Sequence, residues 1–161
     1  MPAEYPFTGG PYLEAALLCE KVLQELDGVK SVIRIVDRVT RQLFGPTIPM
    51  EMEPFEHELF LFVRFKSGSA RGPMSLQVKM IKPSGESPAP FMSTIIFEGE
   101  EDRGVDIVMG MKIKFDQTGL YWFLVGLGEV IVTRIPLRIT YIPQIMQILP
   151  GGNNPPPPGK G

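Results

Sequence analysis

The only histidine of the chain stands in an acidic stretch, where it could help to bind a metal ion. His57 lies within residues 51–58, which read EMEPFEHE. Imidazole and carboxylate groups together suit several divalent cations. In an extended segment, however, Glu56 and Glu58 point to the face opposite His57, which favours a solvated approach to a strand. We therefore expect no metal ligand here.

The only cysteine, Cys19, is the other candidate for reactive chemistry. A reactive thiol needs an electropositive and partly exposed site, whereas Cys19 ends the apolar run AALLC. We expect a small buried hydrophobic side chain. No nucleophile signature surrounds Cys19 or His57, so we predict no catalytic residue and no cofactor. A single cysteine also forms no intramolecular disulfide, which favours a reducing cytoplasm.

Glycine-bearing segments do not match the loops that bind phosphate or activate a serine. Residues 68–72 read GSARG and lack the Gly-Lys-Ser/Thr ending of a phosphate loop. No G-x-S-x-G element occurs either. The sequence thus gives no support for hydrolysis, phosphoryl transfer or nucleotide binding, and we predict a protein that is not an enzyme.

Charged residues alternate with apolar ones in two predicted strands. Over residues 31–40 (SVIRIVDRVT), alternation places Asp37 on the face that we expect to be buried. A buried carboxylate needs a partner, and we predict a buried ion pair with Arg134 or bonds to turn N–H groups. The alternative is a basic patch for an anionic partner, formed by Arg34, Arg38, Arg134 and Arg138.

Apolar residues on both faces of some strands indicate covered strands or contact surfaces. Trp122 and Leu124 lie opposite Tyr121 and Phe123 on one such strand. We predict an interface at Trp122 and Leu124, since tryptophan often dominates binding energy. The N-terminal segment 5–26 is the alternative cover. We also expect contacts from Ile145 and Ile148, within the apolar segment 141–149 (YIPQIMQIL).

The elements that must position these residues are predicted to be strands. The chain has 161 residues with 17 Gly and 17 Pro, and outside the tail these punctuate apolar runs of strand length. Alternation with period 2 dominates those runs. We predict an all-β fold, an antiparallel β-sandwich of about seven to eight strands, with one N-terminal helix as an open alternative. Residues 13–26 carry that alternative, because their propensity favours a helix while sheet context can override it.

The predicted organisation is a single domain with short flanking segments. Residues 1–9 form an N-terminal lead, 10–142 the sandwich, 143–149 an apolar docking segment, and 150–161 a disordered Pro/Gly tail (PGGNNPPPPGKG). A formal charge of −2 gives no global attraction to nucleic acid or to an anionic membrane. No apolar run is long enough to span a bilayer, and no secretory signal is recognised.

Two stretches carry a resemblance to a known family. The first is residues 12–40, with Cys19-Glu20, Asp27-Gly28 and residues 33–38 (IRIVDR); the second is residues 119–123 (GLYWF), followed by residues 134–137 (RIPL). Over roughly residues 12–142 the chain resembles a family of small, uncharacterised bacterial proteins that is defined as a domain of unknown function. The resemblance implies a compact β-sandwich of the bacterial cytoplasm, and it implies no activity or site residue.

A weaker resemblance concerns residues 116–121 (DQTGLY). They are similar to the tyrosine corner of immunoglobulin-like sandwiches, in which the tyrosine hydroxyl bonds to the corner backbone. Asp116 lies five residues before Tyr121, where four is usual, and the cysteine pair of that family is missing.

These observations favour a non-enzymatic binding or assembly module with an unknown protein partner or a second copy of itself. The alternative is a sandwich that binds a small molecule or carbohydrate, with Trp122 or Tyr121 as a stacking surface. An enzyme that uses His57 with Cys19 or the nearby glutamates is the least favoured function.

Overall fold

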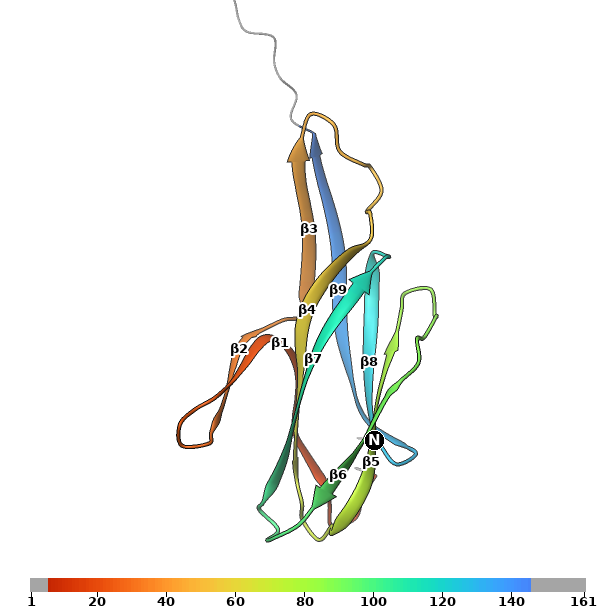
Figure 1. Ribbon diagram of the computed structural model, residues 1–161. Helices are drawn as coiled ribbons and strands as arrows, with labels where there is room; N and C mark the ends of the chain where they lie inside the picture. Colours follow the sequence, from red (N-terminus) through yellow and green to blue (C-terminus); the bar gives the residue numbers. More distant parts are fainter. Residues whose placement is uncertain (1–5, 146–161) are drawn as a thin grey trace, which may run out of the picture.

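The computed structural model describes residues 6–145, which form two β-sheets packed face to face (Figure 1). The strands are β1 (Tyr12–Gln24), β2 (Lys30–Ile35), β3 (Arg38–Gly45), β4 (Phe55–Lys66), β5 (Gly72–Ile81), β6 (Phe91–Phe97), β7 (Gly104–Phe115), β8 (Gly119–Leu127) and β9 (Val130–Ile145). One sheet has the order β2-β1-β4-β7 and the other β3-β9-β8-β5-β6. The predicted all-β sandwich is confirmed, with nine strands instead of seven to eight.

One strand pair departs from the predicted antiparallel arrangement. β3 and β9 are parallel, from Arg38 opposite Arg138 to Gly45 opposite Ile145. The hydroxyls of Thr40 and Thr140 lie 2.8 Å apart across this pair. The two strands continue side by side beyond the other strands as a two-stranded arm, at the top of Figure 1.

The segment with helical propensity is a strand. β1 pairs with β4 with Leu18 opposite Leu61 and Cys19 opposite Phe60, and its other edge pairs with β2. Leu18 is buried in the core. Pairing on both edges outweighs the intrinsic preference of its Ala, Leu, Glu and Lys residues, so the helical alternative was wrong.

Inner-face side chains of both sheets fill one core. Phe65 of β4 meets Phe97 of β6 with ring centroids 6.2 Å apart, and Phe115 of β7 meets Tyr121 of β8 at 5.1 Å. Both pairs are edge to face and each joins one sheet to the other, which adds a directional preference to their burial.

Tyr121 also fixes the β7–β8 corner. Its hydroxyl accepts a hydrogen bond from the backbone N–H of Gln117 at 3.2 Å and donates to the Asp116 carboxylate at 3.3 Å. Burial raises the pKa of this phenol. The contact between hydroxyl and corner backbone matches the expectation, while the wider likeness to immunoglobulin-like sandwiches is not confirmed.

The single strand predicted for residues 31–40 is two strands in different sheets. β2 ends at Ile35 and β3 begins at Arg38, so the chain passes from one sheet to the other at Val36 and Asp37. Arg34 precedes this crossing with a φ of 53°, the one positive φ of a non-glycine residue among residues 6–145. Alternation therefore does not continue across the break.

The outer segments differ from the predicted boundaries. β9 runs to Ile145, past the predicted domain limit at residue 142. Phe7 packs against the core, and the carbonyl of Gly9 accepts a hydrogen bond from the Ser69 N–H at 2.7 Å. The predicted tail, 150–161, lies outside the described residues. Within residues 6–145 we find no helix that could cross a membrane.

Candidate functional site

The outer face of the five-stranded sheet has Trp122 near its centre. Tyr121 and Phe123 are buried, so Trp122 and Leu124 point away from the core. Trp122 stands opposite Pro136 of β9 on one side and Ile81 of β5 on the other. Trp122 is 36% exposed. An apolar row across three strands therefore reaches the surface here, at the predicted interface residues Trp122 and Leu124.

Basic side chains flank this apolar row on both sides. Leu124 stands between Arg134 of β9 and Lys79 of β5. Two residues before Trp122, Leu120 stands opposite Arg138, which in turn stands opposite Arg38 of β3. Diagonal neighbours on a sheet face are about 7–8 Å apart, which is within reach of long side chains. Trp122 thus has three cations as diagonal neighbours: Arg134 and Arg138 on β9, and Lys79 on β5.

No carboxylate balances these cations within the sheet. The strands β3, β5, β6, β8 and β9 contain no Asp or Glu. Their five basic residues are Arg38, Arg41, Lys79, Arg134 and Arg138. The whole chain has a net charge of −2, so the rest of it carries −7. Arg41 shares the strand face of buried Val39 and lies 5.5 Å from the centroid of the Phe55 ring. The other four residues make the outer face of this sheet a basic surface on an acidic protein.

The predicted buried ion pair between Asp37 and Arg134 is wrong. Both residues are exposed. The backbone of Asp37 accepts a hydrogen bond from the Arg138 N–H at 3.0 Å, but its side chain lies at the crossing between the sheets, outside any strand. The alternation that placed it in the core ends at Ile35. Arg134 instead belongs to the basic outer face, which was the alternative interpretation.

The other two predicted interface residues lie at the end of β9. Ile145 is 54% exposed at the tip of the arm, close in register to Phe44, which is also 54% exposed. Ile148 lies outside the described residues.

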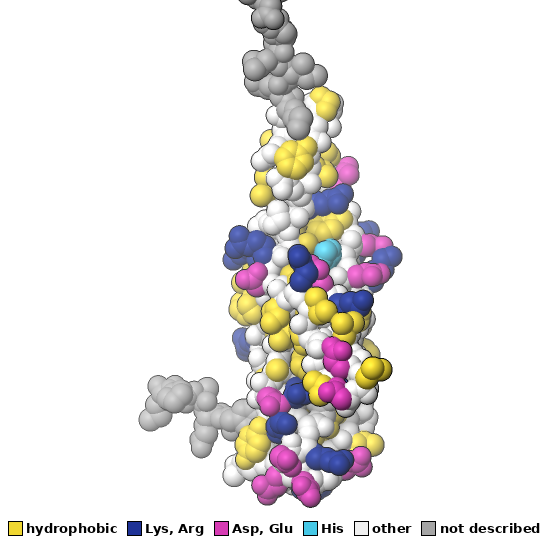
Figure 2. All heavy atoms as spheres, turned by 90° about the vertical axis from the view of Figure 1, so that its left-hand side faces the viewer, with side chains coloured by type: hydrophobic (Ala, Val, Ile, Leu, Met, Phe, Trp, Pro, Cys, Tyr) yellow, Lys and Arg dark blue, Asp and Glu magenta, His cyan; other side chains and the backbone are white. Residues whose placement is uncertain are grey.

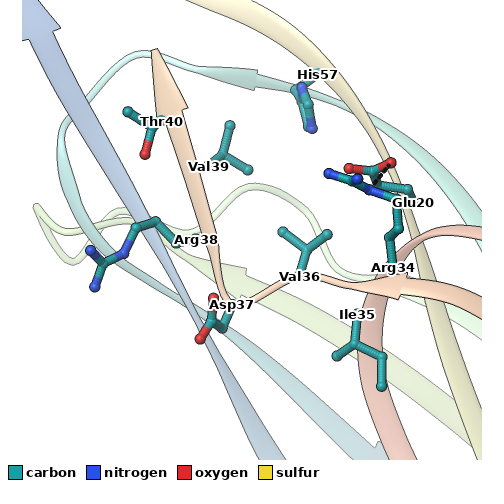
Figure 3. A pocket seen from close by; sticks show the side chains of 9 residues that line it. All are labelled: Glu20, Arg34, Ile35, Val36, Asp37, Arg38, Val39, Thr40 and His57. Carbon is teal, nitrogen blue, oxygen red and sulfur yellow. Dashed lines mark ion pairs between the residues drawn. The ribbon is translucent and has the colours of Figure 1, made fainter. Parts of the chain in front are cut away.

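A polar pocket of about 480 Å³ opens where the two sheets diverge near the β2–β3 crossing. His57 of β4 and Glu20 of β1 line it, each two residues beyond a buried core leucine on its own strand. Glu20 forms an ion pair with Arg34, with 2.8 Å between Oε2 of Glu20 and Nε of Arg34. Figure 3 shows that Arg34 and Glu20 turn toward His57, while Arg38 and Asp37 point away. In Figure 2, His57 lies at the surface among charged side chains.

Cys19 and His57 do not form a dyad. Cys19 is fully buried, and its thiol lies 3.7 Å from the carbonyl oxygen of Phe60. Burial raises the pKa of this thiol, which disfavours the nucleophilic thiolate. Cys19 is registered opposite Phe60, three residues along β4 from His57, or about 10 Å at 3.3 Å per residue.

The acidic residues that neighbour His57 in the sequence do not surround its side chain in the structure. Glu56 forms an ion pair at 2.7 Å with Lys112 of β7, on the face opposite His57. The Lys112 ammonium lowers the pKa of Glu56. In the described part of the chain, no three His, Cys, Asp or Glu side chains are placed to hold a metal ion.

An apolar cleft of about 340 Å³ lies between the edges of the two sheets. Its lining includes Met80 of β5, Met109 and Met111 of β7, Phe91 of β6 and Phe123 of β8. A second hollow of about 540 Å³ continues it along β6 and β7 and shares Phe91 and Met109. Tyr121, one of the two predicted stacking residues, is fully buried and offers no such surface.

The basic face was only partly predicted from the sequence. Arg134, Arg138 and Arg38 were grouped as an alternative, but Lys79 was not connected to them. The available signal was the complete absence of Asp and Glu from the segments that became β5, β6, β8 and β9. That signal needs the strand order, because only the register brings Lys79 into line with Arg134.

The sequence matches one protein family. The family described as "Family of unknown function (DUF6941)" matches residues 14–140. No curated protein matches the chain.

Distant structural similarity is found to a beta-glucosidase from Listeria innocua. In complex with glucose, that enzyme has a TM-score of 0.43 and 13% identity; in complex with gluconolactone, 0.40 and 13%. Each match covers 81% of this chain and 17% of the enzyme. The chain thus spans about a sixth of the enzyme's length, and a similarity this distant assigns it no activity.

Proposed function

The chain belongs to the Family of unknown function (DUF6941), and we propose that it works as a non-enzymatic binding or assembly module of the bacterial cytoplasm. The observation that carries this proposal is the outer face of the five-stranded sheet, where Trp122 is exposed between apolar neighbours and cations that form no ion pair with any described residue. Tryptophan and arginine are the residues most enriched at the energetic centres of protein interfaces.

The surroundings of Cys19 and His57 support the same proposal, since neither side chain is placed to act with the other as a catalytic pair. Cys19 is buried with a raised pKa, and His57 faces an ion pair rather than a nucleophile. The unpaired cysteine fits a reducing compartment. An interaction surface, in contrast, needs only exposed groups of complementary chemistry, which the sheet face provides.

The test compares two substitutions of exposed apolar residues on opposite sheets. Trp122→Glu changes the proposed surface, and Val108→Glu, at 40% exposure on β7, is the matched control. Wild type should form an oligomer, or retain one stoichiometric partner from a bacterial lysate, at micromolar concentration. Trp122→Glu should abolish this and Val108→Glu should keep it. A wild-type protein that is strictly monomeric and captures no partner contradicts the proposal.

A second candidate function rests on the apolar cleft between β6 and β7. Methionine side chains adapt to irregular ligands, and a cavity of about 340 Å³ is within the size range of small-molecule sites. Its lining favours an apolar small molecule over a carbohydrate, whose hydroxyls need many polar partners.

Fluorescence titration with the apolar dye ANS tests this second candidate. Saturable binding to the native protein that is lost in Met111→Glu, but kept in Ile33→Glu, an exposed position on β2 outside both hollows, supports a cleft ligand. Equal dye binding by both variants excludes the cleft as its site. Circular dichroism checks that both variants are folded.

A further inference from the structure

The basic face has an acidic counterpart elsewhere on the same chain. The turn between β6 and β7 carries four carboxylates, Glu98, Glu100, Glu101 and Asp102, and one cation, Arg103. All five side chains are exposed. Within residues 6–145 none of them takes part in an ion pair. The turn is thus an unpaired acidic projection.

The backbone of this turn is held in place, so its carboxylates are presented on a fixed support. The Ser67 N–H donates to the Arg103 carbonyl at 2.8 Å, and the Gly68 N–H donates to the Glu101 carbonyl at 2.9 Å. The Arg103 N–H closes the turn on Glu100 at 3.1 Å. A preorganised projection loses less conformational entropy on binding than a mobile one.

The acidic turn and the basic face do not meet within one chain. The turn passes from the edge of one sheet to the edge of the other at the lower end of the molecule in Figure 1. Acidic side chains gather at that end in Figure 2. Trp122 is registered opposite Ile81 of β5, whereas Phe97, the last residue of β6 before the turn, is registered opposite Gly72. Nine residues of β5, or about 30 Å at 3.3 Å per residue, therefore separate the turn from Trp122 along the strands. Two copies of the chain can therefore join these surfaces where one copy does not.

We propose that the outer face of the five-stranded sheet receives the acidic β6–β7 turn of a second copy of this chain. Arg134 and Arg138 bind the carboxylates of Glu100 and Glu101, and Trp122 forms the apolar centre of the contact. Because the two surfaces differ, the contact is heterologous and joins copies end to side in a ring or an open chain. This inference rests on the proposed function as an assembly module, and it names the partner.

Charge reversal on both sides of the contact tests the proposal. Sedimentation velocity measures association of wild type, Arg134→Glu/Arg138→Glu and Glu100→Arg/Glu101→Arg. Each double variant should raise the dissociation constant by about tenfold or more, since like charges then face each other. An equimolar mixture of the two variants should recover association, because the reversed charges are complementary again. Lys21→Glu/Lys114→Glu, with the same charge change on the other sheet, should associate as wild type does.

Salt provides an independent check on the same samples. Wild-type association should weaken strongly between about 50 mM and about 500 mM NaCl, as the Debye length falls from about 14 Å to about 4 Å. Circular dichroism and thermal melting of each variant verify folding, and recovery in the mixture cannot come from a misfolded variant.

The outcomes separate this inference from the proposed function. A monomeric wild type at low salt, a mixture that does not recover, or association that ignores the Arg134→Glu/Arg138→Glu change each overturn the homotypic contact. If wild type is monomeric but captures another protein in a manner that depends on Trp122, the assembly function stands and only its partner is wrong. If it does neither, both fail.

Discussion

The inner-face residues of β1 and β4 change from apolar to polar at one end of the sandwich. The inner-face row of β4 passes from buried Leu59 to half-buried His57, and that of β1 from Leu18 to Glu20. The change from apolar to polar marks where the core meets water. His57 is therefore explained by its place at the end of a core row, and the Glu20–Arg34 ion pair occupies the pocket beside it.

Cys19 should be inert in the native state. Its burial and raised pKa leave little thiolate at the surface, and reaction requires local opening. We predict that Ellman's reagent modifies the native thiol about a hundredfold or more slowly than the thiol in guanidinium-unfolded protein. Equal rates in the two states would show that the thiol is accessible and would contradict its placement.

At position 34, glycine should give a more stable protein than alanine. The φ of 53° at Arg34 costs a residue with a Cβ about 1 kcal/mol or more, whereas glycine adopts this conformation freely. Both Arg34→Gly and Arg34→Ala lose the ion pair with Glu20. A comparison of the two variants therefore isolates the effect of the backbone conformation. Arg34→Gly should be more stable by about 1 kcal/mol in urea unfolding. The opposite order, which is usual in a strand, would contradict the left-handed backbone.

At the scale of the elements, β4 and β7 form the most extensive pair of the four-stranded sheet. They are registered over twelve residue pairs, from Phe55 opposite Phe115 to Lys66 opposite Gly104. Arg64 and Asp106 face each other within this pair, with Nε–Oδ1 and Nη2–Oδ2 distances of 2.5 and 2.7 Å. This bidentate geometry fixes the relative position of the two strands and raises the strength of the bond.

The Arg64–Asp106 pair gives the protein a pH dependence of defined sign. The hydrogen bond from Arg64 lowers the pKa of Asp106, below its unfolded value of about 3.9. Its contribution to stability is therefore complete above about pH 4 and is lost as the pH falls through the lowered folded pKa. Asp106→Asn should reduce the free energy of unfolding by about 1–2 kcal/mol at neutral pH, with a difference that shrinks below about pH 4.

Glu56→Gln is the matched control for that experiment. Its ion pair with Lys112 also joins β4 and β7, but both side chains are well exposed, so its loss should change stability little. Urea unfolding at several pH values measures both variants. A difference for Asp106→Asn that persists unchanged at low pH would contradict the assigned origin of the effect.

Sequence alternation predicted most of the elements but not how the strands are partnered. Period 2 around Leu59–Phe65 and Tyr121–Val125 identified β4 and β8, because one face of each is buried. The crossing at Val36 and Asp37 was not predicted, since residues 31–40 are strand-forming on both sides of it. Residues 13–26 were ambiguous because their propensity and their pairing favour different structures. Each failure concerns a contact between segments distant in the sequence.

At the scale of the whole molecule, the two sheets differ in charge. Ion pairs such as Arg64–Asp106 and Lys112–Glu56 lie within the four-stranded sheet, whereas the strands of the other sheet carry five cations and no carboxylate. The four-stranded sheet thus balances much of its own charge. Arg41 lies over the Phe55 ring, and the other four cations of the five-stranded sheet are the groups that the proposed partner would contact.

The emission of Trp122 reports directly on whether the outer face of the five-stranded sheet is a contact surface, because the chain has a single tryptophan and it lies at the centre of the proposed surface. The measurement is acrylamide quenching at increasing protein concentration or, if wild type is monomeric, with the captured partner added. Assembly should shift the emission to shorter wavelength and reduce quenching, since contact removes Trp122 from water. Unchanged emission and quenching in the assembled protein would show that this face stays exposed, and would contradict its role as the contact surface.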